Sequence, residues 1–98
     1  MKDNNLPPHA SVIVIGGGIM GCSTLYHLAK MGISDTILLE RNKLTSGTTW
    51  HSAAQVRALR HSQNLTRMIQ YSVDLYSELD RETGQNVGWI QKGSLSIA

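Results

Sequence analysis

The chain has 98 residues, of which 41% are hydrophobic and 16% are charged, and its formal net charge is +2 with histidine neutral. This composition is globular rather than disordered, and the length suits one small domain rather than two. So small a positive charge gives no argument for a nucleic-acid partner. The single cysteine, Cys22, excludes an intrachain disulfide and disfavours a cysteine-rich metal site, so we expect no metal.

The first ten residues, MKDNNLPPHA, are polar and contain both prolines, so we expect a disordered tail over residues 1–10. They lack the apolar core of a secretory signal and the arginine-rich character of a mitochondrial transit segment. No stretch approaches the roughly 18 apolar residues that span a membrane. We therefore expect no membrane partner. The expected location is the cytoplasm, as in a bacterial protein without a signal peptide, or the mitochondrial matrix if a transit peptide is missing.

The first predicted elements are a strand, a helix and a second strand. Val12 to Ile15 is a continuous β-branched run that stops at three glycines, which predicts a strand buried on both faces of a parallel sheet. From Ile19 to Met31 apolar residues recur at helical spacing, and Gly32 follows where a left-handed cap would end the helix. Thr36 to Glu40 predicts a second buried strand. Together they form one βαβ unit of an α/β fold, whose crossover is almost always right-handed.

The pattern changes after the second strand. A loop without apolar periodicity, RNKLTSGTTWHSAA, leads to an amphipathic helix from about Ser62 to Glu82, with Gly84 as its stop. The runs VGWIQ and SLSIA, joined by Lys92 and Gly93, predict the start of a β-hairpin. Two parallel strands and one hairpin make a poor sheet by themselves, so either a partner covers the exposed edges or the chain is a fragment of a longer protein. We favour the fragment.

A glycine-rich turn joins the first strand to the first helix. Gly16, Gly18 and Gly21 stand in the G-x-G-x-x-G spacing. The first glycine permits a tight turn, the second lets a pyrophosphate approach the backbone, and the third lets the helix pack close to the strand. Amides around Ile19 and Met20 would then face the phosphate at the positive end of the helix. In this strand-to-helix context the motif predicts a Rossmann-type dinucleotide-binding unit, against the alternative of a generic turn with chance glycines.

Glu40 ends the second predicted strand 19 positions after Gly21, where an acid would hydrogen-bond a ribose 2′-hydroxyl. Its carboxylate would repel a 2′-phosphate, although the neighbouring Arg41 keeps that alternative open. The glycine turn does not distinguish NAD from FAD, because both cofactors use the same cradle.

The stretch SGTTWHSAA, residues 46–54, lies in the loop that begins where ligands bind in open α/β sheets. His51 suits a hydrogen-bond donor, a base or a nucleophile, because neutral imidazole is nucleophilic near neutral pH. The residues alone leave open an ordinary loop histidine and a packing role for Trp50. The other members can contact a phosphate or ribityl chain, or let a flat ring approach: Gly47, Thr48, Thr49, Ser52, Ala53 and Ala54.

From about Ser11 to its last residue, the chain resembles the N-terminal FAD-binding segment of the D-amino-acid-oxidase-like FAD-dependent oxidoreductase superfamily, especially its dimethylglycine and sarcosine dehydrogenases. The resemblance is carried by VIVIGGGIMG, YHLAKMG, ILLE, LTSGTTWHSA, LDRETG and GWIQKGSLSIA. The Gly-Thr-Thr-Trp-His-Ser-Ala run is far more specific than the glycine turn. The resemblance implies that His51 carries FAD covalently, through the 8α-methyl of the flavin. It implies further FAD contacts at Ile19, Met20, Glu40, Arg41 and every residue from Gly47 to Gln55.

The resemblance also implies a reaction and a domain plan. Residues 11–86 would be the N-terminal part of an FAD-binding domain, and residues 87–98 the first strands leading into an incomplete substrate domain. The implied reaction is oxidation of an N-methylated amino acid by hydride transfer to the flavin, giving an iminium ion that water hydrolyses to release formaldehyde. Tetrahydrofolate would capture the one-carbon unit if a folate domain follows. Electrons would leave to an electron-transfer flavoprotein or to oxygen. No catalytic residue is assigned in this segment, and the fragment alone is expected to be inactive.

Two alternatives to this function come from other classes. One is a catalytically silent flavin-binding regulatory subunit, and the other is an NAD-dependent dehydrogenase, which the Thr-Thr-Trp-His loop disfavours. One position departs from the family, which commonly has glycine where this chain has Ala54, and a methyl there could shift the loop.

Some remaining polar residues have a structural and a functional interpretation. Cys22 and His27 are expected to be structural residues of the first helix. The basic residues after the loop are either solvated charge, or one of them holds a substrate carboxylate or stabilises the reduced flavin anion. These residues are Arg57, Arg60, His61 and Arg67.

Overall fold

The computed structural model describes residues 6–97, and the chain divides into two compact units, residues 1–53 and 54–98. Half of the predicted tail, residues 1–5, lies outside the described residues. Its other half, residues 6–10, has no regular secondary structure.

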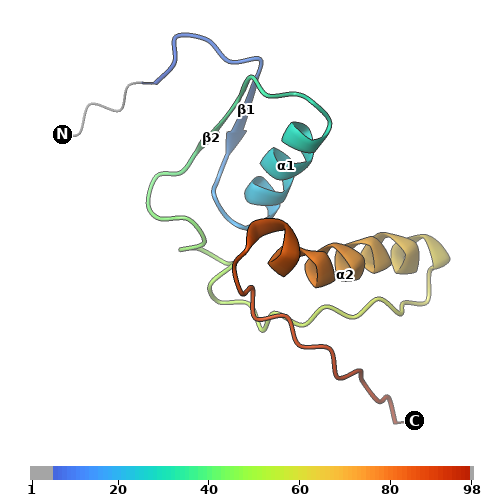
Figure 1. Ribbon diagram of the computed structural model, residues 1–98. Coiled ribbons are helices and arrows are strands. Elements are labelled where there is room, and N and C mark those ends of the chain that lie inside the picture. The colour runs from blue at the N-terminus through green and yellow to red at the C-terminus, as the bar shows by residue number, and fades with distance from the viewer. Residues whose placement is uncertain (1–5, 98) are drawn as a thin grey trace. The chain divides into compact units, whose positions relative to one another are not determined.

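The first unit is the predicted βαβ unit. It consists of β1 (Val12–Ile15), α1 (Ile19–Lys30) and β2 (Thr36–Leu39). The two strands pair in parallel, and α1 connects them (Figure 1). The α/β prediction is confirmed, and α1 and β2 each end one residue earlier than the sequence pattern predicted.

The C-terminal end of α1 follows the predicted glycine stop. Gly32 has a φ of 87°, in the left-handed region that glycine adopts at no steric cost. The amides of Gly32 and Ile33 donate to the carbonyls of Ala29 and Leu28 at 3.0 and 2.9 Å. This pair of bonds is a Schellman motif, which satisfies carbonyls that the end of the helix would otherwise leave unpaired.

β1 is covered on one face only. Val12 and Val14 are half-buried, and a Cβ built on Gly21 of α1 would lie 3.5 Å from Val14 Cγ1. Ile13 and Ile15 alternate with them and are 56% and 85% exposed. The prediction that this strand is buried on both faces is therefore wrong for the described residues. The physical reason is that α1 covers one face, whereas a parallel sheet normally has helices on both.

The second unit is built around α2 (Gln63–Thr83), as the sequence predicted. The Ser62 side chain caps the helix by accepting from the Leu65 amide at 3.4 Å, and Gly84 ends it with a φ of 69°. On the C-terminal side, the ring of Trp89 stacks on Tyr76 of α2, with centroids 5.3 Å apart and ring planes 18° apart.

The predicted hairpin is not formed, because residues 86–97 contain no strand. Gly88 has a φ of 71°, which interrupts the extended backbone within the first run, whereas Gly93, with a φ of 75°, lies in the segment that joins the two runs. Trp89 packs on α2 instead of facing a partner strand. An isolated two-stranded hairpin is marginally stable, so this prediction fails where the segment lacks a sheet to join.

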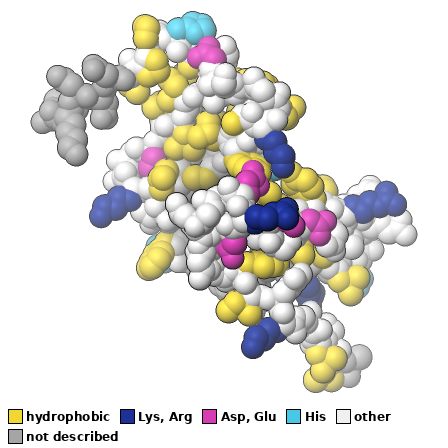
Figure 2. All heavy atoms as spheres, viewed as in Figure 1, with side chains coloured by type: hydrophobic (Ala, Val, Ile, Leu, Met, Phe, Trp, Pro, Cys, Tyr) yellow, Lys and Arg dark blue, Asp and Glu magenta, His cyan; other side chains and the backbone are white. Residues whose placement is uncertain are grey.

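Apolar side chains reach the surface in both units. No hydrophobic side chain among the described residues is fully buried, and yellow hydrophobic atoms are widely visible in Figure 2. Within residues 6–97, no helix has both the length and the apolarity needed to cross a membrane.

Candidate functional site

The glycine turn between β1 and α1, together with the first turn of α1, is crowded where side chains would stand on Gly17, Gly18 and Gly21. Gly16 adopts a φ of 107°, and its amide donates to the Leu39 carbonyl at 2.8 Å. A Cβ on Gly21 would lie 1.8 Å from the Gly16 carbonyl oxygen, and a Cβ on Gly18 would lie 2.9 Å from Thr49 Oγ1. Among the described residues, nothing lies within 4 Å of a Cβ built on Gly16. The backbone there is open to the close approach that a diphosphate requires.

Glu40 follows β2 directly and lies beside this turn. Its Oε2 accepts a hydrogen bond from the Gly17 amide at 2.7 Å, and its Oε1 accepts one from the Asn42 amide at 2.9 Å. The Asn42 amide first, and then the Gly17 amide, lower the pKa of the Glu40 carboxyl below its ordinary value of 4.5. The group is therefore ionised at neutral pH. A carboxylate has about four acceptor positions, so it can still accept from the hydroxyls of a ribose.

Sequence reasoning missed Gly17 and Asn42, which orient this carboxylate through their backbone amides. A Cβ on Gly17 would lie 2.6 Å from Leu44 Cδ2 and 3.1 Å from Glu40 Cβ, so a side chain there would have to displace the Leu44 side chain and crowd Glu40. The sequence did point to Gly17, since the G-x-G-x-x-G motif accepts any residue at this position and the chain nevertheless has glycine there. Asn42 gives no such signal, because any residue except proline provides an amide.

The first amide of α1 is already bonded. Ile19 N–H donates to Thr49 Oγ1 at 2.9 Å, although the sequence suggested that this amide would face a phosphate. Met20, the other residue predicted there, lies in the first turn of the helix and is 82% exposed. The structure therefore brings the loop after β2 onto the glycine turn through the Thr49 side chain.

The loop around the Trp-His pair is a series of hydrogen-bonded turns. It is joined to the glycine turn by its main chain, since the Thr45 amide donates to the Gly17 carbonyl at 2.8 Å. Three further amides, of Trp50, His51 and Ser52, donate to the carbonyls of Thr45, Thr48 and Thr49 at 3.1, 3.1 and 3.3 Å. The loop is thus organised by its own backbone.

His51 lies in this loop with its ring orientation fixed. Its Nδ1 is 2.8 Å from the Gly47 carbonyl oxygen. A carbonyl can only accept, so Nδ1 carries the proton and Nε2 has the free lone pair in the neutral ring. Trp50 is 77% exposed, so the packing role considered for it is not seen in the described residues.

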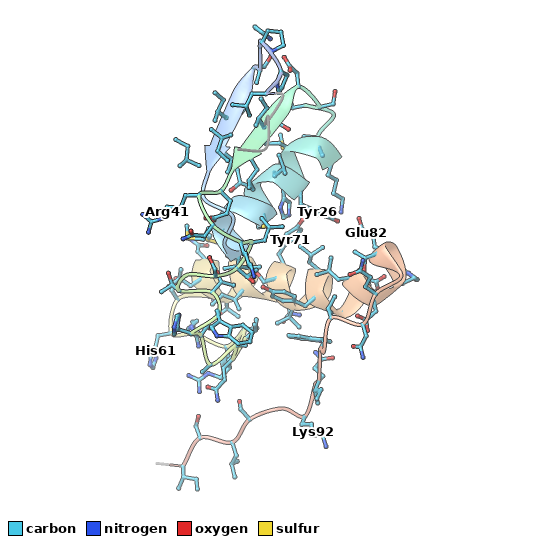
Figure 3. All side chains as sticks on the ribbon, turned by 90° about the vertical axis from the view of Figure 1, so that its left-hand side faces the viewer. Tyr26, Arg41, His61, Tyr71, Glu82 and Lys92 are labelled. Carbon is cyan, nitrogen blue, oxygen red and sulfur yellow. The ribbon has the colours of Figure 1, made fainter. Side chains whose placement is uncertain are left out.

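The other predicted contact residues fall into two groups. Thr48, Ser52 and Ala53 lie in the same first-unit loop and are exposed, as is Gly47. Arg41 extends outward from the segment after β2 (Figure 3). The two remaining residues, Ala54 and Gln55, belong to the second unit.

Ala54 has a φ of 56°, in the left-handed region that favours glycine. This is the position where the resemblance leads us to expect glycine. Ala54 thus adopts a backbone conformation that favours glycine, although its side chain carries a methyl group.

The second unit contains a groove of about 860 Å³. Arg57, Arg60 and Lys92 are among the residues that line it, together with Trp89. The Trp89 Nε1 atom is buried and has no hydrogen-bond partner among the described residues. His61 and Lys92 extend outward from the segments before and after α2 (Figure 3).

Cys22 and His27 have structural partners within α1 and its turn. Cys22 Sγ lies 3.6 Å from the Gly17 carbonyl oxygen. His27 Nδ1 lies 2.6 Å from the Ser23 carbonyl oxygen one helical turn earlier. The structural interpretation of both residues fits these contacts.

A strand, a glycine turn that excludes side chains and an ionised acid at the end of the next strand define a dinucleotide-binding unit. The sequence from residue 11 to residue 98 matches the FAD dependent oxidoreductase (DAO) family. The chain belongs to this family. The glycine cradle and the Glu40 acceptor suit the adenosine diphosphate part of FAD.

Several curated proteins are similar to the chain. Sarcosine dehydrogenase, mitochondrial, of Homo sapiens is 53% identical over 94 residues, which cover 95% of this chain and 10% of that protein. Dimethylglycine dehydrogenase, mitochondrial, of Homo sapiens is 45% identical over 89 residues, 91% of this chain and 10% of that protein. The pyruvate dehydrogenase phosphatase regulatory subunit, mitochondrial, of Mus musculus is 45% identical over 93 residues, 95% of this chain and 11% of that protein. The chain thus spans about a tenth of the length of these relatives.

Proposed function

We propose that the protein is an FAD-dependent dehydrogenase or oxidase of N-methylated amino acids, of the sarcosine and dimethylglycine type, with the flavin linked to His51. The observation that carries the proposal is the bond between His51 Nδ1–H and the Gly47 carbonyl at 2.8 Å. It leaves Nε2 as the nucleophilic nitrogen of a neutral imidazole, which is the form that a covalent bond to the flavin requires. Two similar proteins are named for sarcosine and dimethylglycine.

The residues of this chain would bind and orient the cofactor. The glycine turn would hold the diphosphate, Glu40 the adenosine ribose, and the loop from Gly47 to Gln55 the flavin side. Bound FAD supplies a hydride acceptor for the N-methyl carbon of the substrate. The proposed domain plan keeps residues 11–86 in the FAD-binding domain and residues 87–98 at the start of the substrate domain.

The covalent link is tested on the full-length protein by acid precipitation. We expect a yellow pellet from the unchanged protein, and a colourless pellet with yellow supernatant from His51→Ala. His27→Ala is the matched control, because His27 lies in α1, where it contacts the Ser23 carbonyl and the Tyr26 ring. A flavin that acid releases from the unchanged protein would contradict the linkage.

Substrate and electron acceptor are tested with the same protein. Sarcosine or dimethylglycine should bleach the flavin absorbance under anaerobic conditions. Recovery of the colour on admitting air indicates oxygen as the acceptor, and recovery only with an electron-transfer flavoprotein indicates that protein. Capture of the one-carbon unit by tetrahydrofolate is proposed only for a protein with a downstream folate domain.

A second candidate is a catalytically silent flavin-binding regulatory subunit. It is favoured by the likeness to a protein named as a phosphatase regulatory subunit, at 45% identity. Bound flavin that neither sarcosine nor dimethylglycine bleaches would support it. The relatives named above are mitochondrial by name, so we propose the mitochondrial matrix as the location alongside the cytoplasm.

A further inference from the structure

We propose that the Thr49 hydroxyl is a positioning group, which fixes the Trp-His loop on the first turn of α1 and thereby places His51 for attachment of the flavin. The inference rests on the proposed covalent flavin. Thr49 would act through the loop, and it need not touch the reacting atoms.

The first step is the anchor itself. Ile19 N–H donates to Thr49 Oγ1 at 2.9 Å. This amide is the first of α1, where the helix itself provides no partner. Gly18 makes the contact possible, because a Cβ there would lie 2.9 Å from the same oxygen and 3.9 Å from Thr49 Cβ. The bond therefore depends on both the glycine and the hydroxyl.

The second step is the path from Thr49 to the imidazole. The Thr49 carbonyl accepts from the Ser52 amide at 3.3 Å, and the His51 amide donates to the Thr48 carbonyl at 3.1 Å. The ring itself is held by Gly47 at 2.8 Å. These contacts are all inside the loop, so they set the orientation of His51 relative to the loop and not relative to α1.

The third step is what fixes the loop to the cradle. The main-chain bond from Thr45 to the Gly17 carbonyl holds the start of the loop at 2.8 Å. The Thr49 hydroxyl holds it four residues further on, two residues before His51. Threonine suits this task, because its β-branched side chain has few χ1 rotamers. Without the hydroxyl, the histidine end of the loop loses its side-chain bond to α1.

The experiment measures the rate at which full-length apoprotein forms acid-stable flavin, at saturating FAD and in air. The linkage replaces one C–H bond of the 8α-methyl group and one N–H bond of the imidazole, and oxygen accepts the two protons and two electrons released. Because FAD is saturating, the measured rate reports the placement of His51 and does not depend on the affinity for the cofactor. Thr49→Val keeps the shape of the side chain and removes the oxygen that accepts from Ile19 N–H. We expect the rate of flavin attachment to fall by about tenfold or more, because small misplacements of reacting groups can lower a rate by up to about a hundredfold. Thr49→Ser should retain most of the rate. Thr24→Val is the matched control, since the Thr24 hydroxyl donates to the Met20 carbonyl within α1.

The outcomes separate this proposal from the proposed function. Acid-stable flavin that forms at the unchanged rate in Thr49→Val overturns the positioning role and leaves the linkage standing. No acid-stable flavin in the unchanged protein overturns both. If Thr49→Val does not fold, Thr49→Ala removes the hydroxyl without adding a methyl group and gives the same comparison. Faster hydrogen exchange at the Trp50 to Ser52 amides in the slowed variant, restored in Thr49→Ser, supports the role of the anchor.

Discussion

At the scale of single residues, Gly21 sets the distance between α1 and β1. A Cβ there would lie 1.8 Å from the Gly16 carbonyl oxygen, so Gly21→Ala must displace backbone rather than a flexible side chain. We expect a loss of about 1–3 kcal/mol of stability, as for other overpacked sites, and reduced FAD content. Urea unfolding and flavin absorbance measure both. Gly47→Ala is the stability control, because a Cβ built there meets nothing within 4 Å among the described residues. An equal loss in both variants would contradict the prediction.

Glu40 should contribute stability that depends on pH. Its carboxyl has a lowered pKa in the folded chain, because the Asn42 and Gly17 amides bond to the charged form. Such a group stabilises the fold above its ordinary value of 4.5, and this contribution is lost as the pH falls through the lowered pKa. Glu40→Gln should therefore be less stable than the unchanged protein at pH 7, and the difference should narrow below about pH 4.5.

Thermal unfolding between pH 3 and pH 7 measures that difference. Glu78→Gln is the control, since Glu78 pairs with Arg81 on the exposed side of α2. A gap for Glu40→Gln that stays constant across the whole pH range would refute the assigned role of the two amides.

Ala54→Gly is expected to stabilise the protein. Ala54 has a φ of 56°, and the left-handed region costs a non-glycine residue about 1–2 kcal/mol. Glycine adds about 0.5–1 kcal/mol of unfolded-state entropy, so the net gain should be about 0.5–1 kcal/mol. The midpoint of denaturant unfolding measures it. Gly84→Ala is the converse control, with a φ of 69°, and it should lose stability.

The sequence predicted side-chain roles better than backbone roles. The glycines at 16, 18 and 21 and the acid at 40 stand out in the sequence by their spacing, because the role proposed for each depends on the residue type. The amides of Gly17 and Asn42 were missed, because a backbone donor has no signature in the sequence. Thr49 was assigned to a phosphate or ribityl chain, whereas it accepts from Ile19, a partner that depends on how the loop folds back.

At the scale of elements, α2 was predicted almost to the residue because its ends have local signals. Ser62 caps the first turn and Gly84 ends the last. The hairpin failed because a strand needs a partner, and no local pattern shows whether one is present. Likewise, a continuous apolar run does not show which face of β1 is covered and which is exposed.

Ser62→Ala should therefore weaken α2 locally. Losing an N-cap costs about 1 kcal/mol, because the Leu65 amide loses its acceptor. Hydrogen exchange at the Leu65 amide should speed up, while amides in the middle of α2 change little. Ser77→Ala is the matched control, since the Ser77 hydroxyl bonds to the Asp74 carbonyl inside the helix. Equal exchange at Leu65 in both variants would show that the cap contributes nothing.

At the scale of the whole molecule, the chain leaves apolar surface that its own elements do not cover. Ile13 and Ile15 project from the face of the two-stranded sheet opposite α1, with 56% and 85% of their surface exposed. Parallel sheets are stable when both faces are covered. Because the relatives are about ten times as long, we expect this face to be covered in the longer protein.

The double substitution Ile13→Lys with Ile15→Lys should therefore change different properties of the isolated chain and of the longer protein. In the isolated 98-residue chain it should reduce binding of a fluorescent apolar dye, because it removes exposed apolar surface. In the longer protein it should cost about 3 kcal/mol or more, since two isoleucines lose burial and two charges enter an apolar layer. Met31→Lys is the control, because Met31 follows the end of α1 and is 75% exposed. Unchanged thermal stability of the longer protein would mean that the open face of β1 stays in contact with water.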